Sequence, residues 1–234
     1  MIGKIIEKKE ITKNTLRISF QIPESVNFKP GQYMFVTLLN PKFIDDKGNK
    51  RQFSIVNSPN NSNILTMTTR ISESGFKKSL LQLPIGAEVQ IGPIAGVFTL
   101  PAPIKSRLVF IAGGIGITPF MSMLAYIKER KLPYQITLVY SNRNQSSTAY
   151  LQEVNEFTQT IPNFKYILTI TDDPDWTGEK RLIDAQFIKD YFPNVNDNFY
   201  MVVGPPLMVT AVKEALILAG VLEDNIKFEN FTGY

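Results

Sequence analysis

The sequence contains neither cysteine nor histidine. Without cysteine, this chain has no disulfide, no thiolate-bound zinc or iron–sulfur cluster and no cysteine nucleophile. Without histidine, it has no Ser-His-Asp triad, no histidine-bound haem or zinc, and no side chain that titrates near neutral pH at its ordinary pKa. An enzyme of this composition either works with carboxylates, amines and hydroxyls alone or, for redox chemistry, hosts an organic cofactor.

Long charge-free runs are also scarce. The first ten residues carry five charged side chains and no continuous apolar stretch, so we expect no secretory signal and a cytoplasmic protein. Residues 108–127 are uncharged and long enough to cross a bilayer, but three glycines and Pro119 lie within them. This segment is therefore predicted to be a buried strand, a turn and a helix, with no membrane span.

The 234 residues are 44% hydrophobic and 20% charged, which is typical of a globular chain of one or two domains. The charge is uneven. Residues 1–102 hold 13 Lys and Arg against 7 Asp and Glu, and residues 103–234 hold 12 against 14. The sequence has no run of Lys and Arg that would indicate a nucleic-acid partner. The excess of positive charge in the first half therefore indicates ordinary surface, an anionic cofactor or an acidic protein partner.

The first 102 residues consist of short segments of strand-forming residues separated by turn residues. We expect a helical turn at 75–83 and strands at 11–22, 32–39, 52–56, 64–71 and 88–91. Short strands at this spacing are typical of a closed barrel. The prediction for residues 1–102 is therefore an antiparallel Greek-key β-barrel domain.

The pattern changes at the proline-bracketed segment 101–106, which we take as the domain boundary. Apolar strands are expected afterwards at 108–112, 135–140, 165–171, 198–203 and 226–231, and helices at 119–130, 148–159, 184–192 and 206–219. Alternating apolar strands and helices predict a parallel sheet covered on both faces. Residues 103–234 are therefore predicted to form an α/β domain.

Two glycine-rich turns follow predicted strands of this second domain. In the first, residues 113–119 (GGIGITP), Thr118 is expected to cap the following helix and Pro119 to open it, with free N–H groups that favour an anion. The second turn, residues 204–208 (GPPLM), also opens a helix. Ligands bind at the carboxyl ends of strands in open parallel sheets, so the two turns are candidates to flank one nucleotide. Each turn is also compatible with a purely structural role.

Three segments of the first domain combine residues suited to a phosphorylated ligand. Residues 51–54 (RQFS) place Arg51 and Phe53 on one strand face and Ser54 on the other. Arginine binds phosphate in a bidentate manner, and an aromatic ring can stack on a ligand. Residues 75–79 (GFKKS) indicate either a phosphate-binding helix start or an exposed basic turn, and residues 92–98 indicate a turn that closes the barrel.

Taken in order, these motifs resemble those of the ferredoxin–NADP reductase-like flavoprotein superfamily, over nearly the whole chain. Residues 51–54 are similar to its RxYS flavin motif, 75–79 to its FAD pyrophosphate segment, and 92–98 to its GPxGxF barrel end. Residues 113–119 are similar to its GxGxTP loop, 203–208 to its CGPPxM motif, and 228–234 to the ExFxGY tail of short bacterial members without an iron–sulfur domain.

The resemblance implies an FAD-binding barrel joined to an NAD(P)-binding α/β domain. It implies that Arg51 binds FAD phosphate, that Phe53 packs on the flavin, and that Ser54 lies near flavin N5. The residues expected near the reacting atoms are Ser54, Glu229 and either Phe231 or Tyr234, one of which would cover the flavin face. The residues expected to bind FAD or NAD(P) are Arg51, Gln52, Phe53, Ser54, Thr69, Gly75, Lys77, Lys78, Ser79, Gly114, Gly116, Thr118, Pro119, Arg143, Gly204, Pro205 and Met208. No metal site is expected.

Phe53 stands where the RxYS motif has tyrosine, and two further departures from the family pattern matter more. Val203 stands where the family often has cysteine, and hydride transfer itself needs no thiol because alignment of the reactants is its main requirement. In residues 140–150, where NADPH-specific relatives place several basic groups, this chain has Arg143 alone. The sequence therefore favours NADH weakly over NADPH.

The predicted function is an FAD-dependent NAD(P)H oxidoreductase that takes hydride onto flavin N5 and passes electrons to a separate acceptor. The candidates for that acceptor are a ferredoxin, a flavodoxin, an oxygenase component or a small oxidant, and the positive first half favours an acidic electron-carrier protein or oxygenase component. Two alternatives stay open. One is a non-catalytic subunit that senses nucleotide or docks to a larger complex, and the other is an FMN-binding reductase.

Overall fold

The computed structural model of the chain describes residues 1–60, 63–102 and 107–232. These residues form two compact units, each with its own sheet. The first unit comprises Met1–Thr99 with Thr118–Tyr126, and the second comprises Leu100–Ile117 with Ile127–Thr232. An antiparallel sheet followed by a parallel sheet confirms the predicted fold class.

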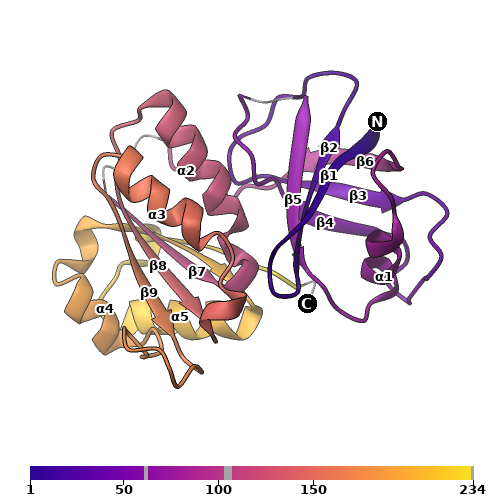
Figure 1. Ribbon diagram of the computed structural model, residues 1–234. Coiled ribbons are helices and arrows are strands. Elements are labelled where there is room, and N and C mark those ends of the chain that lie inside the picture. The colour runs from indigo at the N-terminus through magenta and orange to yellow at the C-terminus, as the bar shows by residue number, and fades with distance from the viewer. Residues whose placement is uncertain (61–62, 103–106, 233–234) are drawn as a thin grey trace. The chain divides into compact units, whose positions relative to one another are not determined.

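The first unit is a curled sheet of six strands, drawn in indigo to magenta in Figure 1. Its strands are ordered β4-β3-β6-β1-β2-β5 and every pairing is antiparallel. The two edge strands approach each other where the Val56 N–H donates to the Thr66 carbonyl oxygen at 2.8 Å. The strands are β1 (Ile2–Thr12), β2 (Thr15–Gln21), β3 (Tyr33–Leu38), β4 (Lys50–Ser54), β5 (Ile64–Arg70) and β6 (Glu88–Ala95).

The core of this unit follows from the alternation of side chains along the strands. In β3, Met34, Val36 and Leu38 are buried and the residues between them are only partly covered. Helix α1 (Gly75–Gln82), predicted from the sequence, adds Phe76 to the same core. The helix begins after Ser74, whose hydroxyl accepts a hydrogen bond from the Lys77 N–H at 3.3 Å.

The single strand predicted at 11–22 is wrong, because this segment contains a tight turn. The chain reverses at Lys13 and Asn14, and Asn14 adopts a left-handed φ of 56°. Asparagine tolerates that conformation better than most residues. The strand before the turn is the long β1, Ile2–Thr12, which pairs with β2 after it. The turn predicted at 92–98 is also shorter than expected, since β6 continues to Ala95 and the reversal falls at Gly96, with a φ of 110°.

The second unit is a parallel sheet of five strands in the order β11-β10-β7-β8-β9. Its strands are β7 (Arg107–Gly113), β8 (Gln135–Asn142), β9 (Phe164–Ile170), β10 (Phe199–Gly204) and β11 (Ile226–Asn230). Helix α3 (Leu151–Thr160) lies on one face, and α4 (Ala185–Tyr191) and α5 (Pro206–Leu218) lie on the other (Figure 1). The side chains of Val109 and Ile111 in β7 are buried. They belong to one apolar cluster with Phe187 of α4 and Val209 of α5.

Residues 108–127 form a strand, a turn and a helix, as predicted. Strand β7 runs into a 3-10 turn (Gly114–Ile117) and then into helix α2 (Thr118–Arg130). The expected cap at Thr118 is wrong: Ile117 holds the N-cap position with a helical φ of −63°, because the 3-10 turn already has helical geometry. Over the described residues, no helix is long and apolar enough to cross a membrane.

Helices α3 and α4 both begin slightly later than predicted. Tyr150 has a φ of 62°, so the right-handed helix α3 begins at Leu151 rather than at Thr148. Asp184 lies outside α4 as its cap, and its carboxylate accepts a hydrogen bond from the Phe187 N–H at 2.7 Å.

Candidate functional site

Strand β4 brings Arg51 and Phe53 to one aromatic side chain of the first unit. The guanidinium carbon of Arg51 lies 5.3 Å from the ring centroid of Phe76, and the Phe53 ring centroid lies 5.8 Å from it. Both side chains therefore share the strand face that the sequence predicts. Ser54 is buried, whereas Gln52 is exposed.

The Arg51 guanidinium is held by the loop that joins β3 to β4. Its Nη2 lies 2.6 Å from the Asp45 carboxylate, and its Nη1 donates to the carbonyl oxygens of Lys47, Gly48 and Lys50 at 2.8 to 2.9 Å. Partial burial by itself would raise the pKa of Asp45. The hydrogen bonds from Arg51, Lys47 and Phe76 outweigh it and hold that pKa below its ordinary value. Asp45 is not among the predicted site residues, because no local pattern of residues places it beside Arg51.

The three polar residues of the GFKKS segment lie in three different environments. Lys77 is buried, and burial together with the nearby charge of Arg51 lowers its pKa. Lys78 is half-exposed and forms an ion pair with Glu73, with Nζ and Oε2 2.6 Å apart. Ser79 is buried, and its hydroxyl both accepts from the Phe43 N–H at 2.7 Å and donates to the Phe43 carbonyl oxygen at 2.9 Å.

Gly75, at the start of α1, is approached closely by the same loop. A Cβ at this position would lie 2.7 Å from the Ile44 carbonyl carbon and 2.8 Å from the Asp45 nitrogen, so no side chain fits. Thr69 is buried on β5, where its hydroxyl donates to the Arg70 carbonyl oxygen at 3.3 Å. Among the described residues, the structure thus brings together Arg51, Phe53, Gly75 and Lys77, and leaves Thr69 and Gln52 outside that group.

In the second unit, the two glycine-rich turns contact each other at the carboxyl ends of β7 and β10. A Cβ on Gly116 would lie 2.6 Å from the Val203 carbonyl oxygen and 2.9 Å from the Gly204 Cα. A Cβ on Gly113 would lie 2.1 Å from the Met208 sulfur and 3.1 Å from Pro205 Cδ. The glycines permit this close approach, which puts both turns at one edge of the sheet, as expected for a shared ligand.

Glu229 and Phe231 lie at the same sheet edge. Glu229 pairs in register with Val203, and the Phe231 N–H donates to the Gly204 carbonyl oxygen at 2.9 Å. Burial raises the pKa of Glu229 to about 7, only partly offset by the charge of Lys227. Its Oε2 is buried without a hydrogen-bond partner among the described residues, so this carboxyl group is a candidate for proton chemistry. Tyr234, also predicted here, lies outside the described residues.

Arg143 follows the carboxyl end of β8 and is exposed. Its carbonyl oxygen accepts from the Asp172 N–H at 2.8 Å, and the Asp173 carboxylate accepts from the Gln145 N–H at 3.0 Å. Two aspartates that follow β9 therefore border the loop that carries Arg143. Neither aspartate is among the predicted site residues, because only the pairing of β8 with β9 brings them next to that loop.

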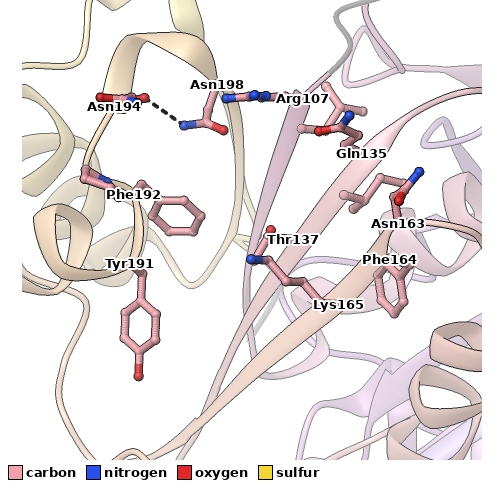
Figure 2. Close-up of a pocket in the computed structure, with 13 residues that line it drawn as sticks. Arg107, Gln135, Thr137, Asn163, Phe164, Lys165, Tyr191, Phe192, Asn194 and Asn198 are labelled. Carbon is pink, nitrogen blue, oxygen red and sulfur yellow. Dashed lines mark hydrogen bonds between the residues drawn. The ribbon is translucent and has the colours of Figure 1, made fainter.

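A cavity of about 540 Å³ lies at the opposite edge of the parallel sheet. It is lined by residues at the starts of β7, β8 and β9, such as Arg107, Gln135 and Phe164, and by the 191–198 segment (Figure 2). The seven residues of β7 separate Arg107 from Gly113 by about 20 Å. This cavity is therefore distinct from the edge that carries the glycine-rich turns.

The matches to protein families follow the two halves of the chain. Residues 3–99 match the oxidoreductase FAD-binding domain, and residues 110–214 match the oxidoreductase NAD-binding domain. The chain belongs to the oxidoreductases that join these two domains. The two matches confirm the resemblance drawn from the motifs and the expected FAD-binding and NAD-binding domains.

Relatives of known function include reductases with different partners. The chain is 29% identical over 220 residues to the reductase component 1 of terephthalate 1,2-dioxygenase from Comamonas, covering 92% of this chain and 63% of that protein. It is 24% identical over 227 residues to NADH-cytochrome b5 reductase 1 of Candida glabrata, covering 93% of this chain and 78% of that protein. The chain thus spans less than two thirds of the dioxygenase component.

Solved structures share the fold over the whole chain. A ferredoxin NADP+ reductase from Neisseria gonorrhoeae with bound FAD and NADP superimposes with a TM-score of 0.82 at 20% identity, covering 98% of both chains. The reductase GcoB of an Amycolatopsis cytochrome P450 system gives a TM-score of 0.84 at 22% identity, covering 98% of this chain and 68% of GcoB. At these identities, the likeness concerns the fold.

Proposed function

We propose that this chain is an FAD-dependent NAD(P)H oxidoreductase that passes electrons from a reduced nicotinamide nucleotide to a separate acceptor. The observation that carries the proposal is the contact between the two glycine-rich turns, at the carboxyl edge of a sheet that matches an NAD-binding domain. When bound, FAD would supply the acceptor for a pair of electrons and the donor for single-electron steps.

The residues of the first unit fit a flavin nucleotide with phosphate groups. Arg51, Lys77 and the first N–H groups of α1 form a positive cluster, and Phe53 adds an aromatic face beside it. Because charge-assisted bonds to phosphate are the stronger hydrogen bonds, Arg51 and Lys77 would hold the pyrophosphate. Ser54 would orient the flavin ring. This donor set favours FAD over a flavin with no pyrophosphate.

The residues of the second unit would bind the nicotinamide nucleotide. The backbone of Gly114 and Gly116 would approach the pyrophosphate, and Gly204 with Pro205 would border the nicotinamide. Thr118 and Met208 would also contact this nucleotide. Glu229 would hold a proton near neutral pH, since burial keeps its pKa at about 7.

NADH is the proposed donor. Arg143 is the single basic residue in 140–150, and Asp173 places a carboxylate beside the same loop. A 2′-phosphate would bring negative charge next to that carboxylate, and like charges at short range repel. Comparing kcat/KM for NADH and NADPH tests this preference, and a higher value for NADPH would overturn it.

The proposed acceptor is an acidic electron carrier or an oxygenase component. Several relatives are reductase or electron-transfer components of oxygenases, and residues 1–102 carry six more basic than acidic residues, 13 against 7. Attraction between opposite charges speeds association at low salt. Turnover with an acidic carrier should therefore fall as ionic strength rises, and a rate independent of salt would argue against such a partner.

The decisive experiment is a visible spectrum of the purified protein, followed by anaerobic titration with NADH and, separately, with NADPH. Flavin bands that bleach on addition of one nucleotide would establish the reductase and its donor. A colourless protein that takes up no FAD would instead favour the non-catalytic subunit. The mass of any released flavin separates FAD from FMN.

A further inference from the structure

The loop between β3 and β4, residues 39–49, is fastened over the start of α1. Ser79 holds it at Phe43 through two hydrogen bonds, and the backbone of Ile44 and Asp45 packs directly against Gly75. The Asp45 side chain then reaches both cationic and N–H groups. One of its oxygens lies 2.6 Å from Arg51, and the other accepts from the Phe76 N–H at 3.4 Å.

This loop holds the Arg51 guanidinium through several hydrogen bonds. Besides Asp45, its guanidinium donates to three carbonyl oxygens of residues 47–50. Asp45 is itself fixed by the turn, because its Oδ1 also accepts the Lys47 N–H at 3.0 Å and its carbonyl oxygen accepts the Gly48 N–H at 2.8 Å. The first turn of α1 contains no acidic residue, so Asp45 supplies the negative charge that a helix N-terminus favours.

We infer that Asp45 occupies, as an internal anion, the groups that would bind the flavin phosphates, and that it must leave them when FAD binds. This inference rests on the proposed FAD-binding function. It assigns Asp45 as a residue that sets the affinity of the protein for FAD.

Asp45 and a flavin phosphate compete for the same hydrogen-bond donors. A carboxylate and a phosphate are both anions that accept charge-assisted hydrogen bonds from arginine and from helix N–H groups. A guanidinium already bonded to four oxygen atoms has few N–H groups left for a phosphate. An Asp45 carboxylate that stayed in place would also repel the phosphates. The protein binds FAD only in the state in which Asp45 has left Arg51. The apparent affinity for FAD is therefore reduced in proportion to the fraction of molecules in that state.

The test compares two charge-neutral variants of neighbouring residues, Asp45→Asn and Asp46→Asn. Asp46 is exposed and lies next to Asp45, so its replacement changes the net charge equally without touching Arg51. The dissociation constants of FAD and of riboflavin are measured by quenching of flavin fluorescence on the flavin-free protein. Riboflavin has no phosphate, so it reports on the flavin ring alone.

We expect Asp45→Asn to bind FAD about tenfold more tightly than the wild-type protein, with riboflavin affinity unchanged and Asp46→Asn equal to wild type. A tenfold change is about 1.4 kcal/mol, within the range of one charge-assisted hydrogen bond. Weaker FAD binding by Asp45→Asn would mean that Asp45 orients Arg51 toward the flavin, and equal binding would mean that the two anions do not compete. Either result overturns the inference.

A second measurement uses the wild-type protein and needs no variant to fold. If Asp45 leaves on FAD binding, amide hydrogen exchange in residues 44–48 should become faster with FAD bound, while exchange in α1 becomes slower. Slower exchange in both segments would overturn the inference and leave FAD binding intact. A protein that binds FAD in neither the wild-type nor the Asp45→Asn form would instead remove the proposed function, and the inference with it.

Discussion

Glu229 on β11 pairs in parallel register with Val203 on β10, the residue that directly precedes Gly204. The only carboxyl group of β11 therefore lies at the edge where the two glycine-rich turns meet. Burial there makes its negative form unfavourable, which is the property that a proton donor near neutral pH requires.

Replacing Glu229 with glutamine should change how stability depends on pH. Burial raises the pKa of Glu229 from 4.5 to about 7. Between these values the folded protein binds more protons than the unfolded chain, so the free energy of unfolding falls as the pH rises through this window. The loss should be on the order of 1–2 kcal/mol, reduced by partial solvent screening. Urea unfolding at pH 5 and pH 8 should show a smaller difference in the free energy of unfolding for Glu229→Gln than for the wild-type protein. The same difference in both proteins would contradict the burial of the charge.

Replacing Arg51 with alanine should weaken flavin retention. The substitution removes charge-assisted bonds to phosphate worth about 1.5–3 kcal/mol, which corresponds to a rise in the FAD dissociation constant of roughly 10- to 100-fold. Arg17→Ala is the matched control, because Arg17 lies on the same barrel and pairs with Glu7 at 3.1 Å. Equal flavin occupancy in Arg51→Ala, Arg17→Ala and wild type would remove Arg51 from the proposed site.

Replacing Gly116 with alanine should disrupt the nucleotide edge of the second unit. The added Cβ would meet backbone atoms of Val203 and Gly204 at 2.6 and 2.9 Å, so the turn and β10 must move apart. Overpacking of this kind costs typically about 1–3 kcal/mol. We expect a lower melting temperature and a higher KM for the nicotinamide nucleotide, with the flavin spectrum retained. A variant with wild-type KM would show that the turn does not contact the nucleotide.

Replacing Asp173 with asparagine should reduce the discrimination against NADPH. The amide oxygen can still accept the Gln145 N–H, while the negative charge and the weaker 3.2 Å bond from the Asp175 N–H are removed. The ratio of kcat/KM for NADH to that for NADPH should fall several-fold, since removing a like charge lowers a repulsion of about 1 kcal/mol in a solvent-exposed setting. Asp175→Asn is the control, because Asp175 is an exposed aspartate of the same loop. If the ratio of kcat/KM for NADH to that for NADPH is the same in Asp173→Asn and Asp175→Asn, another residue sets the preference for NADH.

The sequence predicts best the features that depend on neighbouring residues. The strand, 3-10 turn and helix of residues 107–130 follow from an apolar run, a glycine cluster and a proline that are adjacent in the chain. The alternation in β4 likewise places Arg51 and Phe53 on one face. The hairpin at Asn14 was missed because its turn lacks glycine, and asparagine alone is a weak signal for a left-handed residue.

Features that depend on distant partners could not be predicted. Asp45 acquires its role from the Phe76 N–H, 31 residues away, and from an arginine whose orientation the turn at 47–50 decides. Asp173 approaches the Arg143 loop only because β8 and β9 are neighbours in the sheet. The burial that raises the pKa of Glu229 also arises from packing, which no local pattern of residues reports.

The contact between the two glycine-rich turns also limits how this protein can change over evolution. Gly116 has no room for a side chain, because a Cβ there would meet backbone atoms of Val203 and Gly204, so substitutions there damage the sheet edge before they alter nucleotide choice. The loops after β8 and β9 are exposed and bear the charged residues Arg143, Asp172 and Asp173. Engineering of a new electron donor would therefore begin in these loops, where a charge can be exchanged without moving the backbone that the glycines hold.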